Sequence, residues 1–122
     1  MQQGPSSFLA DCPSRLAVEI LADKWSALIL FALSQGPMRH GELVDRIGGV
    51  SRKVLTETLR RLHDYGLVER DEQPGRRIEY RLTDVGRSLI DPIEMLNTWA
   101  SDHAADIEDR RVARESDGSD ER

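Results

Sequence analysis

Apolar residues in the first third of the chain recur at the three- and four-residue spacing that is typical of amphipathic helices. Pro13 suits the first position of a helix over residues 13–21, with Cys12 as its N-cap. A second helix is predicted to begin near Asp23, which can cap it, and to end at Gly36. This second helix should form the centre of the core through Trp25, Leu28, Ile29, Ala32 and Leu33.

The middle of the chain predicts two short helices joined by a tight turn. The segment RHGELVDRI at 39–47 is expected to form the first helix, and Gly48 and Gly49 should end it. Ser51 is a suitable N-cap for the second helix, which should stop before Gly66. Two short helices around a glycine-containing turn are the framework of a helix-turn-helix.

The second of these helices has two unlike faces. At about 100° per residue, one face holds Leu55, Leu59 and Leu62, and another holds Arg52, Lys53, Thr56 and Arg60. A helix fits the major groove of DNA, where arginine can pair with guanine and threonine can contact base edges. The basic face therefore predicts DNA recognition, and a merely solvated face is the alternative. Arg61 lies on the opposite flank, where pairing with Glu57 is its alternative role.

Residues 67–82 predict a β-hairpin directly after this helix. Strands are expected at 67–70 and 78–82, with the turn at Pro74. Arg76 and Arg77 lie beside the tip of the hairpin, where they are placed to meet DNA phosphates or the minor groove. The predicted fold class is therefore mainly α with a small β-hairpin wing (α+β), arranged as a winged helix-turn-helix.

A last long helix is expected after Thr83, with a kink or break at Pro92. Its apolar stripe and that of the first helix exceed what one small core needs, which predicts a homodimer. The expected dimerisation residues are Leu16, Ile20, Leu89, Ile93, Leu96 and Trp99. The predicted domain organisation is a flexible arm at 1–11, the winged domain at 12–108 and a disordered acidic tail at 109–122.

Charge is unevenly distributed over the 122 residues, whose net charge is −5. Residues 39–87 hold 11 basic and 9 acidic side chains, whereas residues 101–122 hold 4 and 8. A mildly basic centre agrees with a local DNA-binding face, and the acidic remainder argues against indiscriminate binding. No apolar run is long enough to span a membrane and no signal peptide is evident, so we expect a cytoplasmic protein, nucleoid-associated when bound to DNA.

No enzyme signature is present in the sequence. The chain lacks a phosphate-cradling glycine motif, a nucleophile elbow and a metalloprotease helix. The 3 histidines are scattered, so neither a metal nor a cofactor is expected. The single cysteine excludes an intrachain disulfide. The rival to a DNA-binding protein is a winged-helix module that binds another protein.

Residues 12–103 resemble the HxlR family of bacterial regulators, within the wider MarR-like winged-helix group. The resemblance is carried by CP at 12–13, KW at 24–25, GEL at 41–43, VSRKVLTETLRRL at 50–62, YGLVER at 65–70, EYRLTDVGRSL at 79–89 and MLNTW at 95–99. The sequence departs from the family pattern at His40, where an aromatic residue is usual, and at Arg52, where a proline is common.

The resemblance implies a homodimeric DNA-binding transcriptional regulator, often a repressor, that dimerises through its first and C-terminal helices. It also implies sensing of quinones, aldehydes or thiol oxidants through Cys12, whose thiolate the helix N-terminus and Arg15 favour and Asp11 opposes. An inert Cys12 and a non-covalent small-molecule inducer are the alternatives. The expected DNA partner is a double-stranded, inverted-repeat operator. The expected DNA-binding residues are Ser51, Arg52, Lys53, Thr56, Arg60, Arg61, Arg76 and Arg77.

Overall fold

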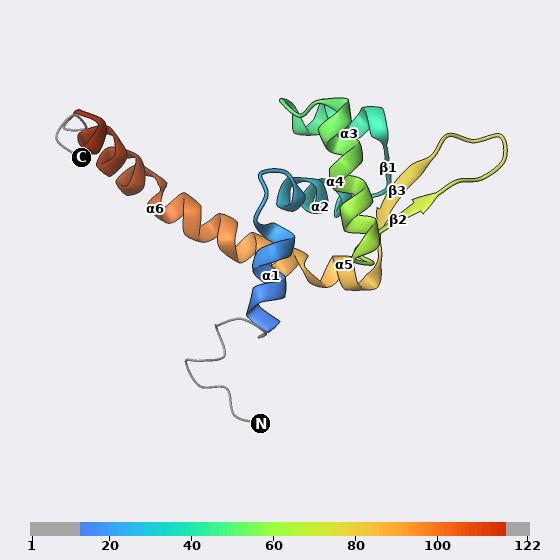
Figure 1. The fold of residues 1–122 in the computed structure, drawn as a ribbon, viewed down its shortest axis with the longest axis horizontal. Helices are drawn as coiled ribbons and strands as arrows, with labels where there is room; N and C mark the ends of the chain where they lie inside the picture. The colour runs from blue at the N-terminus through green and yellow to red at the C-terminus, as the bar shows by residue number, and fades with distance from the viewer. Residues whose placement is uncertain (1–12, 117–122) are drawn as a thin grey trace, which may run out of the picture. The chain divides into compact units, whose positions relative to one another are not determined.

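The computed structural model describes residues 13–116. In chain order its elements are α1 (Pro13–Leu21), α2 (Ser26–Leu33), β1 (Met38–Arg39), α3 (His40–Ile47), α4 (Arg52–Asp64), β2 (Val68–Asp71), β3 (Glu79–Leu82), α5 (Asp84–Ser88) and α6 (Ile90–Ser116) (Figure 1). The chain divides into two compact units, the first reaching to Ile90 and the second beginning at Asp91. The arm predicted at 1–11 and Cys12 lie outside the described residues.

Helices α2, α3 and α4 pack together to form the core of the first unit (Figure 1). The inward face predicted for α4 is confirmed, because its three leucines are buried. In α2 the prediction was wrong at one position: Leu28 is 49% exposed, whereas Leu30 is fully buried. The segment SALILFAL is almost wholly apolar, so its pattern does not distinguish an inner face from an outer one. The fully buried apolar side chains are Ile29, Leu30, Leu33, Leu43, Leu55, Leu59, Leu62 and Val68.

A three-stranded antiparallel sheet, in the order β1-β3-β2, lies beside these helices. Strands β2 and β3 form the predicted hairpin, which extends away from the helices of its unit (Figure 1). Gly75 in its connecting loop has φ of 77°, in the left-handed region that favours glycine. Strand β1 was not predicted, because two residues offer no alternation to detect. It pairs Arg39 with Glu79 and so ties the start of α3 to the wing.

Thr83 fixes the turn that follows the sheet. Its hydroxyl accepts a hydrogen bond from the Gly86 amide at 3.0 Å and donates one to the Gly66 carbonyl at 2.6 Å. Thr83 therefore caps α5, as predicted. The single long helix expected here is instead divided at Leu89, before the kink or break predicted at Pro92. Pro92 itself lies in the first turn of α6, where its missing amide removes no helical hydrogen bond.

Helix α6 continues further than the sequence pattern predicted. The disordered tail expected at 109–122 is corrected for residues 109–116, which are helical, while residues 117–122 lie outside the described range. Ion pairs spaced at helical neighbours, Asp106 with Arg110 at 3.2 Å and Glu108 with Arg111 at 3.4 Å, support this polar stretch. No helix within residues 13–116 is long and apolar enough to cross a membrane.

Candidate nucleic-acid interface

Helix α4 presents its polar face to solvent because its opposite face is anchored in the core. Ser51 begins the helix by accepting a hydrogen bond from the Val54 amide at 3.1 Å. Thr58, on the buried side, donates its hydroxyl proton to the Val54 carbonyl at 2.8 Å and so satisfies its own polar group. The helix is thus fixed in rotation, and one side of it stays exposed for its whole length.

The exposed side of α4 carries the residues that the sequence predicted there, namely Arg52, Lys53, Thr56 and Arg60. Arg52, Lys53 and Arg60 have no acidic side chain as an ion-pair partner among residues 13–116. Their positive charges therefore remain available to an external anion. We call this set the α4 basic face.

Arg61 does not belong to this face. Its guanidinium donates to the Asp23 carboxylate and, at 3.1 Å, to the Ser26 hydroxyl oxygen. Both acceptors lie at the start of α2, so Arg61 connects α4 to the N-terminus of a core helix. The assignment of Arg61 to DNA binding is corrected on this ground, and so is its alternative pairing with Glu57. The partner lies 38 positions away in sequence, where local spacing gives no indication of it.

Asp23 is the centre of this connection. Its Oδ1 accepts hydrogen bonds from the Trp25 and Ser26 amides, each at 2.7 Å, and its Oδ2 accepts from the Ser26 hydroxyl at 2.5 Å. Burial acts to raise the pKa of Asp23, but these hydrogen bonds and the Arg61 charge outweigh it, so the pKa lies below its ordinary value. The N-cap residue of α2 is Trp25, so Asp23 precedes the helix, but its carboxylate accepts from the amides at the helix start and is also an ionised partner for Arg61.

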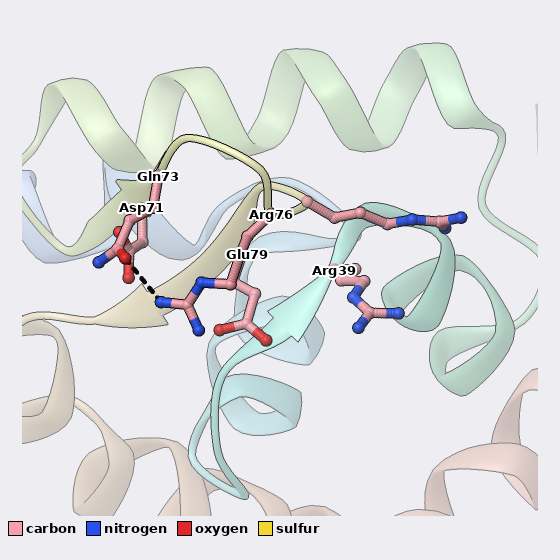
Figure 2. A pocket seen from close by; sticks show the side chains of 6 residues that line it. Arg39, Asp71, Gln73, Arg76 and Glu79 are labelled. Carbon is pink, nitrogen blue, oxygen red and sulfur yellow. Dashed lines mark hydrogen bonds between the residues drawn. The ribbon is translucent and has the colours of Figure 1, made fainter.

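A second group of basic side chains lies where the hairpin loop meets the sheet. Arg39, Arg76 and Arg77 line one pocket, together with Asp71, Gln73 and Glu79 (Figure 2). Arg76 donates to the Gln73 side-chain oxygen at 2.7 Å, a bond between two residues of the hairpin loop (Figure 2). Arg77 has no ion-pair partner among the described residues. Sequence reasoning missed Arg39, which reaches this pocket only because β1 pairs with β3.

The strands of the wing are closer to electrically neutral than its tip. Arg70 pairs with Glu72 at 2.7 Å, and Arg81 pairs with Asp71 across the hairpin. Both arginine side chains remain about half exposed, so each pair contributes little to stability. Their main consequence is that Arg70 and Arg81 are paired within the wing, whereas Arg76 and Arg77 beside its loop have no ion-pair partner among residues 13–116.

One contact joins α3 to the α4 basic face. His40 Nε2 and Thr56 Oγ1 are 2.9 Å apart and share a hydrogen bond. The sequence predicts that Thr56 contacts DNA, and His40 is a departure from the family pattern. It gave no indication that the two side chains meet.

The remaining predicted site residues divide into three cases. Cys12, the predicted sensor, lies outside the described residues. Leu16, Leu96 and Trp99 are 50%, 58% and 53% exposed in the single chain. Ile20 and Ile93 are buried within the chain, at 8% and 7% exposure, and Leu89 is half-buried. Within residues 13–116 no cluster of histidine, cysteine and acidic residues could hold a metal ion.

Comparison with known sequences finds helix-turn-helix proteins. The profile of the family described as HxlR-like helix-turn-helix matches residues 20–108. The HTH-type transcriptional regulator sll1512 of Synechocystis sp. is 39% identical over 93 residues, which are 75% of this chain and 69% of that relative.

Solved structures show the same architecture. A transcriptional regulator, ytfH from Salmonella typhimurium, is 32% identical with a TM-score of 0.73, over 85% of this chain and 95% of that one. The reduced form of the transcriptional regulator YodB from B. subtilis is 33% identical with a TM-score of 0.67, over 73% of this chain and 90% of that one. The diamide-treated form of YodB matches with 31% identity and a TM-score of 0.66, over 77% and 96% of the two chains. These neighbours confirm the predicted winged-helix fold class.

Proposed function

The chain belongs to the HxlR-like helix-turn-helix family and is a transcriptional regulator of helix-turn-helix type, and from this premise we propose that it acts as a homodimer that represses transcription by binding an inverted-repeat operator. The relatives with this family's features are transcriptional regulators rather than enzymes. Beyond the family, the proposal specifies which surface contacts DNA, that the protein acts as a homodimer, and how its DNA binding is controlled.

The α4 basic face is the observation that carries the proposal. Its cations are exposed and have no acidic partners within the described part of the chain, while the opposite face of the same helix is buried. We assign Arg52, Thr56 and Arg60 to base edges in the major groove. Lys53, Arg39 of β1 and the wing arginines Arg76 and Arg77 are assigned to phosphates, which position the protein without reading sequence.

A dimer gives this surface enough contacts to recognise one site in a genome. One winged helix addresses few base pairs, and a two-fold pair places two recognition helices about one DNA turn, or a multiple of it, apart. Exposed apolar side chains on α1 and α6, above all Leu16, Leu96 and Trp99, support self-association because large apolar side chains in water favour burial. The operator is then an inverted repeat.

The test is a mobility-shift series with fragments from the intergenic region next to the gene, repeated at increasing salt. We expect retarded bands whose affinity falls steeply with salt, since each phosphate contact contributes about 0.9 to the slope of log K against log salt. Light scattering of the free protein at micromolar concentration should give the mass of a dimer. A monomeric mass contradicts the assembly, and no salt-dependent shift on any fragment favours a module that binds another protein.

Control through Cys12 is the part of the proposal that rests on relatives. YodB is a relative whose structure has been solved in reduced and in diamide-treated form. With one cysteine per chain, this protein can form an adduct, a mixed disulfide with a small thiol, or a bridge between two Cys12 residues. Diamide should weaken operator binding of the wild type and leave Cys12→Ser unaffected. Equal loss in both proteins, or no loss in either, points instead to a non-covalent inducer.

A further inference from the structure

The hydrogen bond between His40 and Thr56 links the start of α3 to a side chain on the α4 basic face. Nε2 and Oγ1 are 2.9 Å apart. His40 is half-buried at the first position of α3, whereas Thr56 is exposed, one helical turn from both Arg52 and Arg60. The bond therefore ends on a hydroxyl that lies between the two arginines assigned to base edges.

A threonine hydroxyl has one proton to donate and two lone pairs that accept. When His40 Nε2 carries no proton, the Thr56 hydroxyl donates to it and has only lone pairs left for DNA. When Nε2 carries the ring proton, Thr56 accepts from His40 and keeps its own proton for an external acceptor. In a helix the χ1 of threonine is divided between two rotamers, and the bond to His40 favours the one that brings Oγ1 to Nε2.

These two arrangements suit different bases. In the major groove adenine and cytosine present amino groups that donate, whereas guanine and thymine present oxygens that accept. A hydroxyl that has only lone pairs available accepts from adenine or cytosine. A hydroxyl that retains its proton donates to guanine or thymine. An unrestrained hydroxyl can rotate to serve either class and discriminates poorly.

We propose that His40 is a specificity-determining positioning residue, which fixes the Thr56 hydroxyl and thereby sets the base preference at one position of each operator half-site. His40 does not have to touch DNA for this role. The inference rests on the proposed function, because only DNA bound along the α4 basic face gives Thr56 a base to read.

If the bond served only to hold α3 against α4, its removal would have different effects on stability and DNA binding. Its loss would lower thermal stability and weaken binding to every DNA sequence in the same proportion. Loss of a positioning contact instead changes the ranking of the four base pairs at one place, while the other positions keep their preferences. Base preference, measured position by position, therefore separates the two roles.

The experiment measures binding to a set of operators in which each half-site position is changed in turn to the other base pairs. His40→Phe keeps an aromatic ring without ring nitrogens, His40→Gln keeps a hydrogen-bonding group, and Thr56→Val removes the hydroxyl at nearly constant volume. We expect His40→Phe and Thr56→Val to reduce discrimination at the same base pair by about five- to tenfold, near the lower end of what one good base contact supplies. His40→Gln should retain the wild-type preference, and combining the first two changes should add nothing further.

Thermal unfolding of each variant shows that the folded protein is being compared. The inference is overturned if His40→Phe keeps the wild-type base profile, or if its profile changes at a position that Thr56→Val does not affect. Failure of the proposed function looks different, because then the wild type itself shows neither base preference nor salt-dependent binding. In that case both proposals fall, whereas a selective wild type with an unaltered His40→Phe profile overturns this one alone.

Discussion

Arg60 and Arg61 are neighbours on α4, but the first is proposed to contact DNA and the second stabilises the fold. Replacing each by alanine distinguishes these two roles. Arg61 connects α4 to Asp23 and to the Ser26 hydroxyl at the start of α2. Arg60 is exposed on the α4 basic face and has no acidic partner among residues 13–116. We expect Arg61→Ala to lower stability without affecting DNA binding. We expect Arg60→Ala to weaken DNA binding without affecting stability.

The size of the stability loss follows from the exposure of the pair. Hydrogen bonds to charged groups contribute about 1.5–3 kcal/mol when well shielded, whereas exposed ion pairs contribute at most about 1 kcal/mol. The side chains of Arg61 and Asp23 remain 41% and 30% exposed, between these limits. The free energy of unfolding should therefore fall by about 1–2 kcal/mol, which lowers Tm by roughly 4–10 °C in a domain of this size.

The expected loss of binding for Arg60→Ala has a different origin. Truncating an arginine that pairs with a base edge costs about 1–3 kcal/mol and relaxes preference at one position. Because the Arg60 side chain is exposed and makes no hydrogen bond or ion pair with residues 13–116, its removal should change stability by less than about 0.5 kcal/mol. Each variant thus serves as the matched control for the other, with the same change of charge on the same helix.

Thermal denaturation and fluorescence anisotropy with labelled operator measure the two quantities independently. The expected result is a lowered Tm with unchanged affinity and salt slope for Arg61→Ala, and an unchanged Tm with weakened, less selective binding for Arg60→Ala. If Arg61→Ala lost affinity while keeping its Tm, the structural role given to Arg61 would be wrong. If Arg60→Ala bound as tightly as the wild type, the α4 basic face would not be the reading surface.

Three further predictions follow from single contacts. Gly86→Ala should cost about 3 kcal/mol of stability, since a Cβ there overlaps the Leu67 carbonyl oxygen, a backbone atom that cannot easily move. Gly41→Ala, whose Cβ meets nothing within 4 Å, is the control that should keep or raise Tm. Asp23→Asn should be less stable than the wild type at neutral pH. Because the folded-state pKa of Asp23 is lowered, this stability difference is present above the unfolded-state pKa and disappears as pH falls through the folded-state value, which unfolding curves at several pH values would show. Arg77→Ala should weaken binding to all DNA sequences alike and reduce the salt slope by about 1, and a change in base preference would contradict its assignment to phosphate.

The sequence predicted most of what depends on local pattern. The bounds of α1, the buried face of α4 and the hairpin follow from periodicity, because each of these segments contrasts polar with apolar residues clearly. The caps at Ser51 and Thr83 follow from residue chemistry at helix starts. The α4 basic face could be predicted for the same reason, since its four members lie within one helix.

What the sequence could not predict depends on contacts between distant segments or on patterns without contrast. Arg61 resembles its neighbours until the fold brings Asp23 to it. Arg39 becomes part of the pocket beside the hairpin loop only through a strand of two residues. Leu28 and Leu30 could not be ranked within a helix that is apolar on all sides. The helical stretch at 109–116 was mistaken for disorder because a charged composition also suits a helix with ion pairs between neighbouring turns.

Selection of binding sites from a pool of randomised double-stranded DNA tests the central claim most directly, namely that the α4 basic face reads a DNA sequence. The wild type should enrich an inverted repeat whose half-sites lie about one DNA turn, or a multiple of it, apart. A folded variant with Arg52, Thr56 and Arg60 all replaced by alanine should enrich no such motif, although the wing still contacts phosphate. An unenriched pool with the wild type, or the same motif selected by the triple variant, would contradict the account.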